Sequence, residues 1–79
     1  MSTTFRRQFG DNIRKLRESA GLSQEALASA ARLHRTHISL IERGLRSVRI
    51  ETIERLAIAL LVQPADLMPS LRINAGRKR

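Results

Sequence analysis

Residues 33–44, LHRTHISLIERG, gather side chains that could do chemistry. His34 and His37 are three residues apart and could be metal ligands, whereas Arg35, Thr36 and His37 could contact a molecule outside the protein. Zinc takes three or four ligands, and the chain has no cysteine to complete a set. We therefore expect no metal and no other cofactor, and we interpret the polar run as a binding surface.

Arginine dominates the charge of the chain. Its 79 residues carry 15 Lys plus Arg, 13 of them arginine, against 7 Asp plus Glu, for a net charge of +8. The planar guanidinium suits phosphates and guanine edges, and a small basic domain typically meets a polyanion. That polyanion could be nucleic acid or an anionic membrane surface. Only two aromatic residues are present, which argues against base stacking on single strands.

Length and composition limit the remaining classes. We expect one domain over residues 1–72 and a basic flexible tail over 73–79, which would add non-specific attraction to DNA. No apolar run reaches the roughly 18 residues of a membrane span, and the first residues hold no apolar signal core. A cytoplasmic protein without a membrane partner is therefore expected. No nucleophile–base pair, carboxylate dyad or glycine-rich phosphate loop is visible, so we expect no enzyme.

The elements that must position these side chains have helical periodicity almost throughout. Five helices are predicted, at about residues 4–19, 24–31 after the cap Ser23, 35–43, 50–61, and from Pro64 until Pro69 interrupts. In the loop before the fourth helix, Leu45, Val48 and Ile50 are expected to pin the backbone to the core. The sequence thus predicts a compact all-α domain.

The segment GLSQEALASAARLHRTHISLIERGLRSV closely resembles the helix-turn-helix of the phage-repressor (Cro/C1, or Xre) family. The matching positions are Ser23, Gln24, Leu27, Ala28, Ile38, Ile41, Glu42 and Gly44. Continued through IETIERLAIALLVQPADL, the resemblance covers roughly residues 8–68. Within the family, RTHISLIERGLRSV looks most like the controller proteins of restriction–modification systems, small dimeric regulators that time expression of the endonuclease. An antitoxin-like or phage-type repressor of the same fold is the alternative.

A helix-turn-helix presents the first residues of its second helix to base edges in the major groove. The expected base-reading residues are Arg35, Thr36, His37 and Arg46. For Arg46, a base edge and the minor groove are both open. The expected phosphate contacts are Gln24, Ser39, Arg43, Ser47 and Arg49. Arg35 is the first choice, because arginine can bond guanine in bidentate fashion. For His37 a base contact, a phosphate contact and neither remain open.

Several residues have expected roles inside the domain or depart from the family pattern. The resemblance implies that Glu42 is structural and pairs with an arginine, for which Arg14 or Arg17 could serve. Arg32 and Leu61 stand where the family often has glycine, so those turns are either reshaped or strained. Arg49 occupies the usual Ser/Thr cap of the fourth helix and supplies no capping oxygen.

The C-terminal part holds more apolar residues than so small a core can cover. We expect a two-fold dimer interface formed by Leu61, Val62, Leu67, Met68 and Leu71. A dimer would set two reading helices about 34 Å apart on a palindromic operator. We therefore predict a dimeric transcriptional regulator that binds a specific sequence in double-stranded DNA. Once bound near a promoter, it would either block RNA polymerase or contact it. A membrane-coating or nucleoid-coating protein would explain the charge but not the spacing of these short helices.

Overall fold

A computed structural model describes residues 2–71. It contains α1 (Thr3–Ser19), α2 (Gln24–Ala31), α3 (Arg35–Glu42), α4 (Ile50–Leu60) and α5 (Pro64–Leu67), and no strand within the described range. The all-α prediction is confirmed, with helix ends within one residue except for α5, which stops before Pro69. None of these helices is long and apolar enough to cross a membrane. The tail predicted over residues 73–79 lies outside the described residues.

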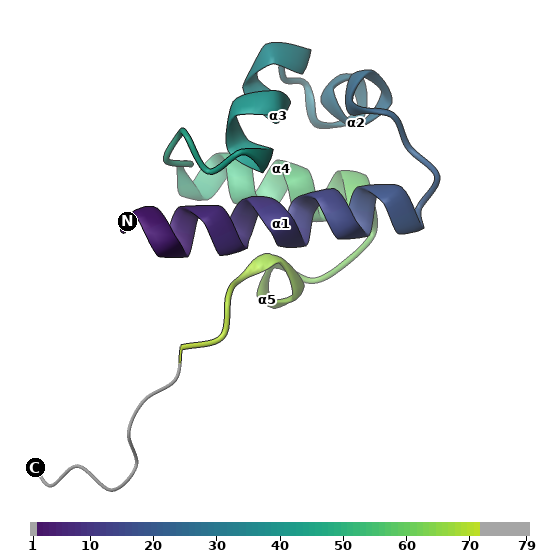
Figure 1. The fold of residues 1–79 in the computed structure, drawn as a ribbon. Coiled ribbons are helices and arrows are strands. Elements are labelled where there is room, and N and C mark those ends of the chain that lie inside the picture. The colour runs from purple at the N-terminus through teal and green to yellow at the C-terminus, as the bar shows by residue number, and fades with distance from the viewer. Residues whose placement is uncertain (1, 72–79) are drawn as a thin grey trace, which may run out of the picture.

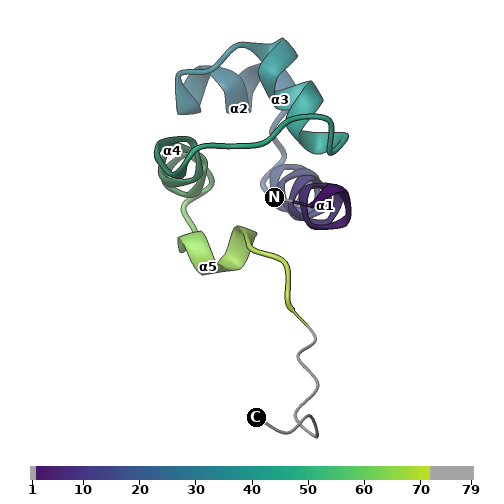
Figure 2. The ribbon, with the colours of Figure 1, turned by 90° about the vertical axis from the view of Figure 1, so that its left-hand side faces the viewer.

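The helices are stacked in three levels. Figures 1 and 2 show α2 and α3 together on one side of the domain, α5 on the opposite side, and α1 and α4 between them. In agreement, α3 packs on α1 and α2, α2 packs on α4, and α5 contacts both α1 and α4. The pair α2–α3 therefore rests on a base made by the longer helices.

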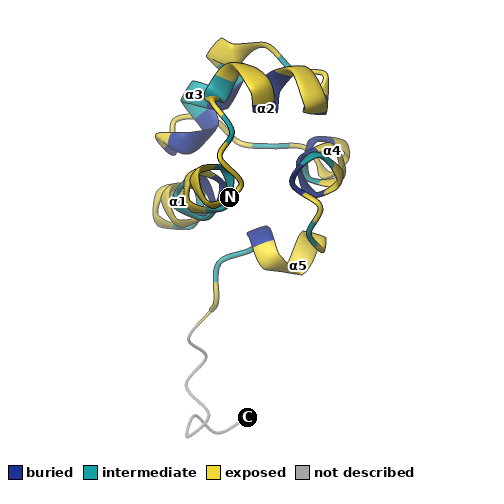
Figure 3. Ribbon diagram, turned by 90° about the vertical axis from the view of Figure 1, so that its right-hand side faces the viewer, coloured by how far each residue is buried: buried dark blue, intermediate teal, exposed yellow. Residues whose placement is uncertain are grey.

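One core joins all five helices. The largest fully buried side chains are Phe9 and Ile13 of α1, Leu27 of α2, Ile38 and Ile41 of α3, Leu56 of α4 and Leu67 of α5. The two in α1 are four residues apart and the two in α3 are three apart, and Leu56 of α4 lies four residues from buried Thr52 and Leu60. This spacing places the buried side chains of each helix on one face. Figure 3 shows the buried positions facing inward and the exposed ones facing out. Burial of these faces is the main force that holds α2 and α3 in place.

Two glycines let α1 approach α3 unusually closely. A Cβ on Gly10 would lie 2.7 Å from the Glu42 carbonyl oxygen and closer still to that of Ile41. Gly44, with a φ of +72°, follows α3, and a Cβ there would lie 2.8 Å from the Cα of Arg7. Backbone atoms cannot move aside as a flexible side chain can. The distance between α1 and the end of α3 is therefore set by main-chain contact.

The turns show how the departures from glycine are accommodated. Arg32 after α2 and Leu61 after α4 both adopt the left-handed conformation, each with a φ of 59°. The turns are thus strained and not reshaped, at a cost of about 1 kcal/mol each. Ser23 caps α2 through its Oγ, which accepts a 2.9 Å bond from the Ala26 amide. Arg49 precedes α4 without a side-chain capping bond, as expected.

Two expectations about apolar residues are wrong. Leu45 and Ile50 do not pin the loop to the core, because their exposed fractions are 61% and 78%, and only Val48 packs against the core. Ile50 lies off the inward face of α4, so its side chain turns toward solvent. Leu67 is completely buried within the chain, so it has no surface to offer a partner and leaves the predicted dimer interface.

Candidate nucleic-acid interface

One face of helix α3 is buried in the core, and the opposite face is exposed. Ile38 and Ile41 are 0% and 1% exposed, while Arg35 and Thr36 at the beginning of the helix are exposed and His37 is partly buried. The buried isoleucines fix the helix, so the first-turn side chains project from a rigid support. The structure therefore brings three of the predicted base-reading residues together at one helix end.

The turn between α2 and α3 is short and is held by two backbone hydrogen bonds. The amides of Arg32 and Leu33 donate to the carbonyls of Ser29 and Ala28, at 3.2 and 2.8 Å. His34 then caps α3 with its backbone alone and keeps an exposed side chain. Within the described range, no three His, Cys, Asp or Glu side chains cluster as a metal site would require.

A buried ion pair ties α3 to α1. Arg17 donates from Nε to Glu42 Oε2 at 2.6 Å and from NH2 to Glu42 Oε1 at 3.0 Å. The two side chains are only 12% and 4% exposed, and a further bond runs from Arg17 NH1 to the Leu22 carbonyl at 2.9 Å. The hydrogen bond to Glu42 raises the pKa of Arg17 and outweighs the opposite effect of burial.

The partner that the sequence left open for Glu42 is therefore Arg17. Arg14, the other candidate, instead donates to Asp11 at 3.2 Å. Asp11 lies one helical turn earlier in α1, and this pair is exposed. Glu42 is 7% exposed, which fits the structural role implied by the family resemblance.

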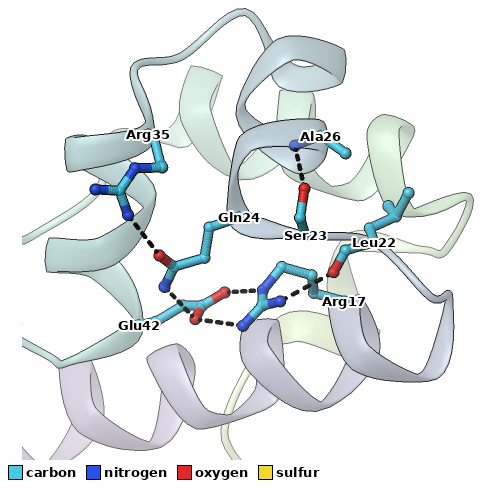
Figure 4. A network of polar contacts seen from close by, with 7 residues as sticks. All are labelled: Arg17, Leu22, Ser23, Gln24, Ala26, Arg35 and Glu42. Carbon is cyan, nitrogen blue, oxygen red and sulfur yellow. Dashed lines mark hydrogen bonds and ion pairs between the residues drawn. The ribbon is translucent and has the colours of Figure 1, made fainter.

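Gln24 connects this ion pair to the exposed end of α3. Its Nε2 donates to Glu42 Oε1 at 3.0 Å, and its Oε1 accepts a bond from Arg35 NH1 at 3.2 Å. Figure 4 shows the four side chains in sequence, from Arg17 through Glu42 and Gln24 to Arg35. Sequence reasoning assigned Gln24 and Arg35 separate contacts and missed the bond between them.

The loop after α3 and the beginning of α4 surround an open hollow beside the first turn of α3. Its lining is Leu33, His37, Arg46, Ser47, Arg49, Thr52 and Arg55, with one carboxylate, that of Glu51. Four of these are predicted DNA contacts, whereas Arg55 of α4, which lines the same hollow, was not among the predicted residues. The signal for Arg55 was available, since it lies between the buried positions of α4 and must face outward. The hollow thus gathers three arginines from the loop and α4 around one histidine of α3.

His37 has an unusual electrostatic setting in this hollow. Burial lowers the pKa of His37, and the positive charge of Arg46 lowers it further. A neutral imidazole both donates and accepts a hydrogen bond, so it can meet a base edge or a phosphate. Of the other predicted phosphate contacts, Ser39 is partly buried in the second half of α3, and Arg43, which directly follows the helix, is exposed.

The predicted dimer interface is partly accessible. Leu61 and Leu71 are 90% and 70% exposed, while Val62 and Met68 are partly buried against the core. The structure adds Ile58 of α4, which is 66% exposed and one helical turn before Leu61. Sequence reasoning could have found Ile58, because it falls off the stripe of buried positions in α4.

Comparison with known proteins gives one consistent family. A helix-turn-helix domain model matches residues 8–71. The chain is 48% identical to the control protein C.BamHI of Bacillus amyloliquefaciens over the full length of both proteins. It is 46% identical to the control protein C.SmaI of Serratia marcescens, covering 86% of this chain and 76% of that protein. The crystal structure of the restriction–modification controller protein C.AhdI from Aeromonas hydrophila superimposes with a TM-score of 0.79 at 41% identity, covering 80% of this chain and 96% of that one.

Proposed function

Because the chain belongs to the helix-turn-helix family of the restriction–modification controller proteins, we propose that it regulates transcription by binding an operator in duplex DNA. The reading helix is α3, and no catalytic step is needed. Regulation follows from occupancy near a promoter, where the bound protein blocks RNA polymerase or contacts it.

The observation that carries this proposal is the division of α3 into two faces. Completely buried Ile38 and Ile41 hold the helix, and exposed Arg35 and Thr36 stand at its beginning. An eight-residue helix is about 12 Å long and fits the major groove, which is about 12 Å wide. In this placement Arg35 bonds guanine, Thr36 meets a base or phosphate, and His37 and Arg46 lie at the edge of the groove.

Phosphate contacts come from the surrounding surface. Arg46, Ser47 and Arg49 are exposed around the hollow beside the first turn of α3, and Arg43 is exposed at the other end of the helix. The net charge of +8 supplies attraction to any duplex. About six to ten such contacts per dimer would make binding fall steeply with salt. Ser39 and Gln24 contribute less, since Ser39 is half covered and Gln24 is bonded within the chain.

The regulator binds as a two-fold dimer through the C-terminal end of α4. The exposure of Leu61 and Ile58 supports this proposal, because large apolar side chains that are so exposed in the monomer typically mark a surface that another protein covers. Val62, Met68 and Leu71 complete the surface. Two copies related by a two-fold axis would present their α3 helices to successive major grooves about 34 Å apart.

Selection of bound sequences from random duplex DNA tests the proposal. We expect enrichment of a palindrome whose half-sites are one helical turn apart. Arg35→Ala should relax the preference at one base position in each half-site, whereas Arg49→Ala should weaken all sequences alike and reduce the salt dependence. Recovery of no enriched palindrome would refute sequence-specific reading.

A further inference from the structure

A second hollow lies where the end of α2 meets the exposed face of α4. Its volume is about 310 Å³, and its lining residues are Ala30, Ala31, Arg32, Arg55 and Ile58. Three of these five are apolar, and the two arginines add the apolar stems of their side chains while their charged ends stay in water. The helices α2 and α4 pack against each other, and Figure 2 shows one above the other. The lining of this hollow is therefore mainly apolar.

Leu61 lies next to this hollow on the same helix. It follows Ile58 by three residues, about one helical turn, and it is 90% exposed. Its backbone is left-handed, with a φ of 59°, a conformation in which glycine would be unstrained. Exposure and strain both count against a leucine in an isolated monomer. This side chain therefore contributes favourably only when another molecule covers it.

An exposed leucine and a hollow side by side suit a second copy of the chain. A two-fold axis passing between Ile58 and Leu61 would carry Leu61 of each copy to the hollow of the other, so that both contacts form at once. A cavity of about 150 Å³ holds a benzene molecule, so this hollow has room for a leucine side chain.

The charges around the hollow are compatible with this partner. Leu61 stands at the C-terminal end of α4, where the last carbonyls of the helix carry a partial negative charge. The end of the second copy's helix would therefore meet Arg32 and Arg55 without repulsion. Both arginines are exposed at the rim, where such interactions remain hydrated and weak. The main contribution to the contact thus comes from the apolar side chains.

We infer that the hollow between α2 and α4 receives Leu61 of a second copy, so that α2 belongs to the two-fold interface together with α4. The inference rests on the proposed function, in which the chain binds DNA as a dimer through the C-terminal end of α4. It adds a defined contact to that dimer. Ala30, which is exposed in the monomer, becomes covered when the dimer forms.

Ala30→Gln is the main test, because glutamine suits a helix while its longer polar side chain would occupy the hollow. Sedimentation measures the dimer Kd, and we expect it to rise by about tenfold or more. The matched control is Ala26→Gln, which changes an exposed alanine one turn earlier in α2 that is not part of the lining. This control should leave the dimer Kd unchanged. Neither variant should change the free energy of unfolding of the monomer, since both positions are exposed.

A double-mutant cycle shows whether the effect passes through Leu61. In a Leu61→Gly background no leucine remains to be excluded, so Ala30→Gln should change the dimer Kd by less than about twofold. An effect that persists in full without Leu61 would overturn the inference. So would an unchanged Kd in Ala30→Gln alone, if Leu61→Gly raises it, because Leu61 would then meet another surface. If Leu61→Gly itself has no effect, the proposed dimer surface fails first, and the inference fails with it.

Crosslinking locates the contact directly, because the chain has no cysteine. Ala30→Cys and Leu61→Cys molecules carrying tags of different size are mixed above the dimer Kd and treated with a short reagent that joins two thiols. We expect far more mixed product than from Leu61→Cys with Gln8→Cys, at an exposed position of α1. Equal yields from the two mixtures would overturn the inference.

Discussion

The α1–α3 side of the molecule and the C-terminal end of α4 are built in opposite ways. On the first side, main-chain contact at Gly10 and a buried ion pair between Arg17 and Glu42 fix α3 from within the chain. At the second, Ile58 and Leu61 expose large apolar side chains, 66% and 90% accessible. One region has completed its interactions inside the monomer, and the other has left them open.

The difference separates two requirements of a regulator that reads a sequence. A reading helix needs a fixed direction, which polar bonds and backbone contact supply because their geometry is specific. A surface for self-association needs apolar area, which is non-directional and gains free energy only when covered. Substitutions on the first side should therefore change stability most, and those at the second should change assembly most.

Gly10→Ala should have the largest effect, because its Cβ would overlap backbone atoms that cannot move aside. We expect a loss of about 4 kcal/mol or more in the free energy of unfolding, despite the better helix propensity of alanine. Urea denaturation followed by circular dichroism measures it. The matched control is Gly21→Ala, where the added Cβ meets no atom and only the positive φ opposes it. Equal losses in the two variants would show that close packing at Gly10 is unimportant.

Arg17→Met should destabilise the domain by about 3 kcal/mol, since it leaves the buried carboxylate of Glu42 without its cation. The same denaturation experiment applies. Arg14→Met, which breaks only the exposed pair with Asp11, should change stability by less than about 1 kcal/mol. A comparable loss from both variants would contradict the distinction drawn between the two arginines.

Leu61→Gly should separate folding from assembly. Glycine relieves the strain of the left-handed turn, about 1 kcal/mol, while loss of the leucine side chain should raise the dimer Kd at least about tenfold. Sedimentation measures the dimer Kd, and denaturation at high dilution measures the free energy of unfolding of the monomer. Arg32→Gly has the same backbone change and should raise stability without weakening the dimer. A dimer unaffected by Leu61→Gly would remove Leu61 from the interface.

The smallest effect is expected from pH. The lowered pKa of His37 keeps its imidazole neutral near pH 7, and a nearby DNA phosphate would favour the protonated form. DNA affinity should therefore rise as pH falls from about 7.5 to about 5.5, by at most about tenfold. Over the same acidic range folding stability should fall, because the unfolded chain takes up that proton more readily than the folded one.

His37→Gln should abolish the pH-dependent gain in affinity, whereas His34→Gln, on the exposed cap of α3, should retain it. Fluorescence anisotropy with a labelled operator measures both. A gain of the same size in His37→Gln would place that side chain away from the phosphates.

Prediction from the sequence succeeded where local patterns decide the structure. The spacing of apolar residues gave the five helices, and the cap Ser23 and Pro64 marked where two of them begin. The role of Glu42 came from the family resemblance, but the choice between Arg14 and Arg17 was left open. The spacing held a signal for it, because Arg17 stands four residues after buried Ile13 and so lies on the inward face of α1, whereas Arg14 is exposed.

What the sequence missed depends on contacts between elements. Leu67 was assigned to a partner surface because its place beneath α1 and α4 is set by a turn that periodicity does not describe. A glycine in the middle of α1 does signal a close approach, but not which helix approaches. The bond between Gln24 and Arg35 joins two helices across a turn, and no spacing rule predicts it.

The Oε1 of Gln24, which accepts the hydrogen bond from Arg35, limits which side chains could replace that arginine. Position 35 faces an acceptor, so it accommodates side chains with N–H donors, such as arginine for guanine or glutamine for adenine. An aspartate or glutamate, which would be needed to accept a bond from cytosine, would meet that oxygen with like polarity. If Arg35 reads a base as proposed, conversion of its preference to cytosine would have to begin at position 24, one helix away from the residue that contacts the base.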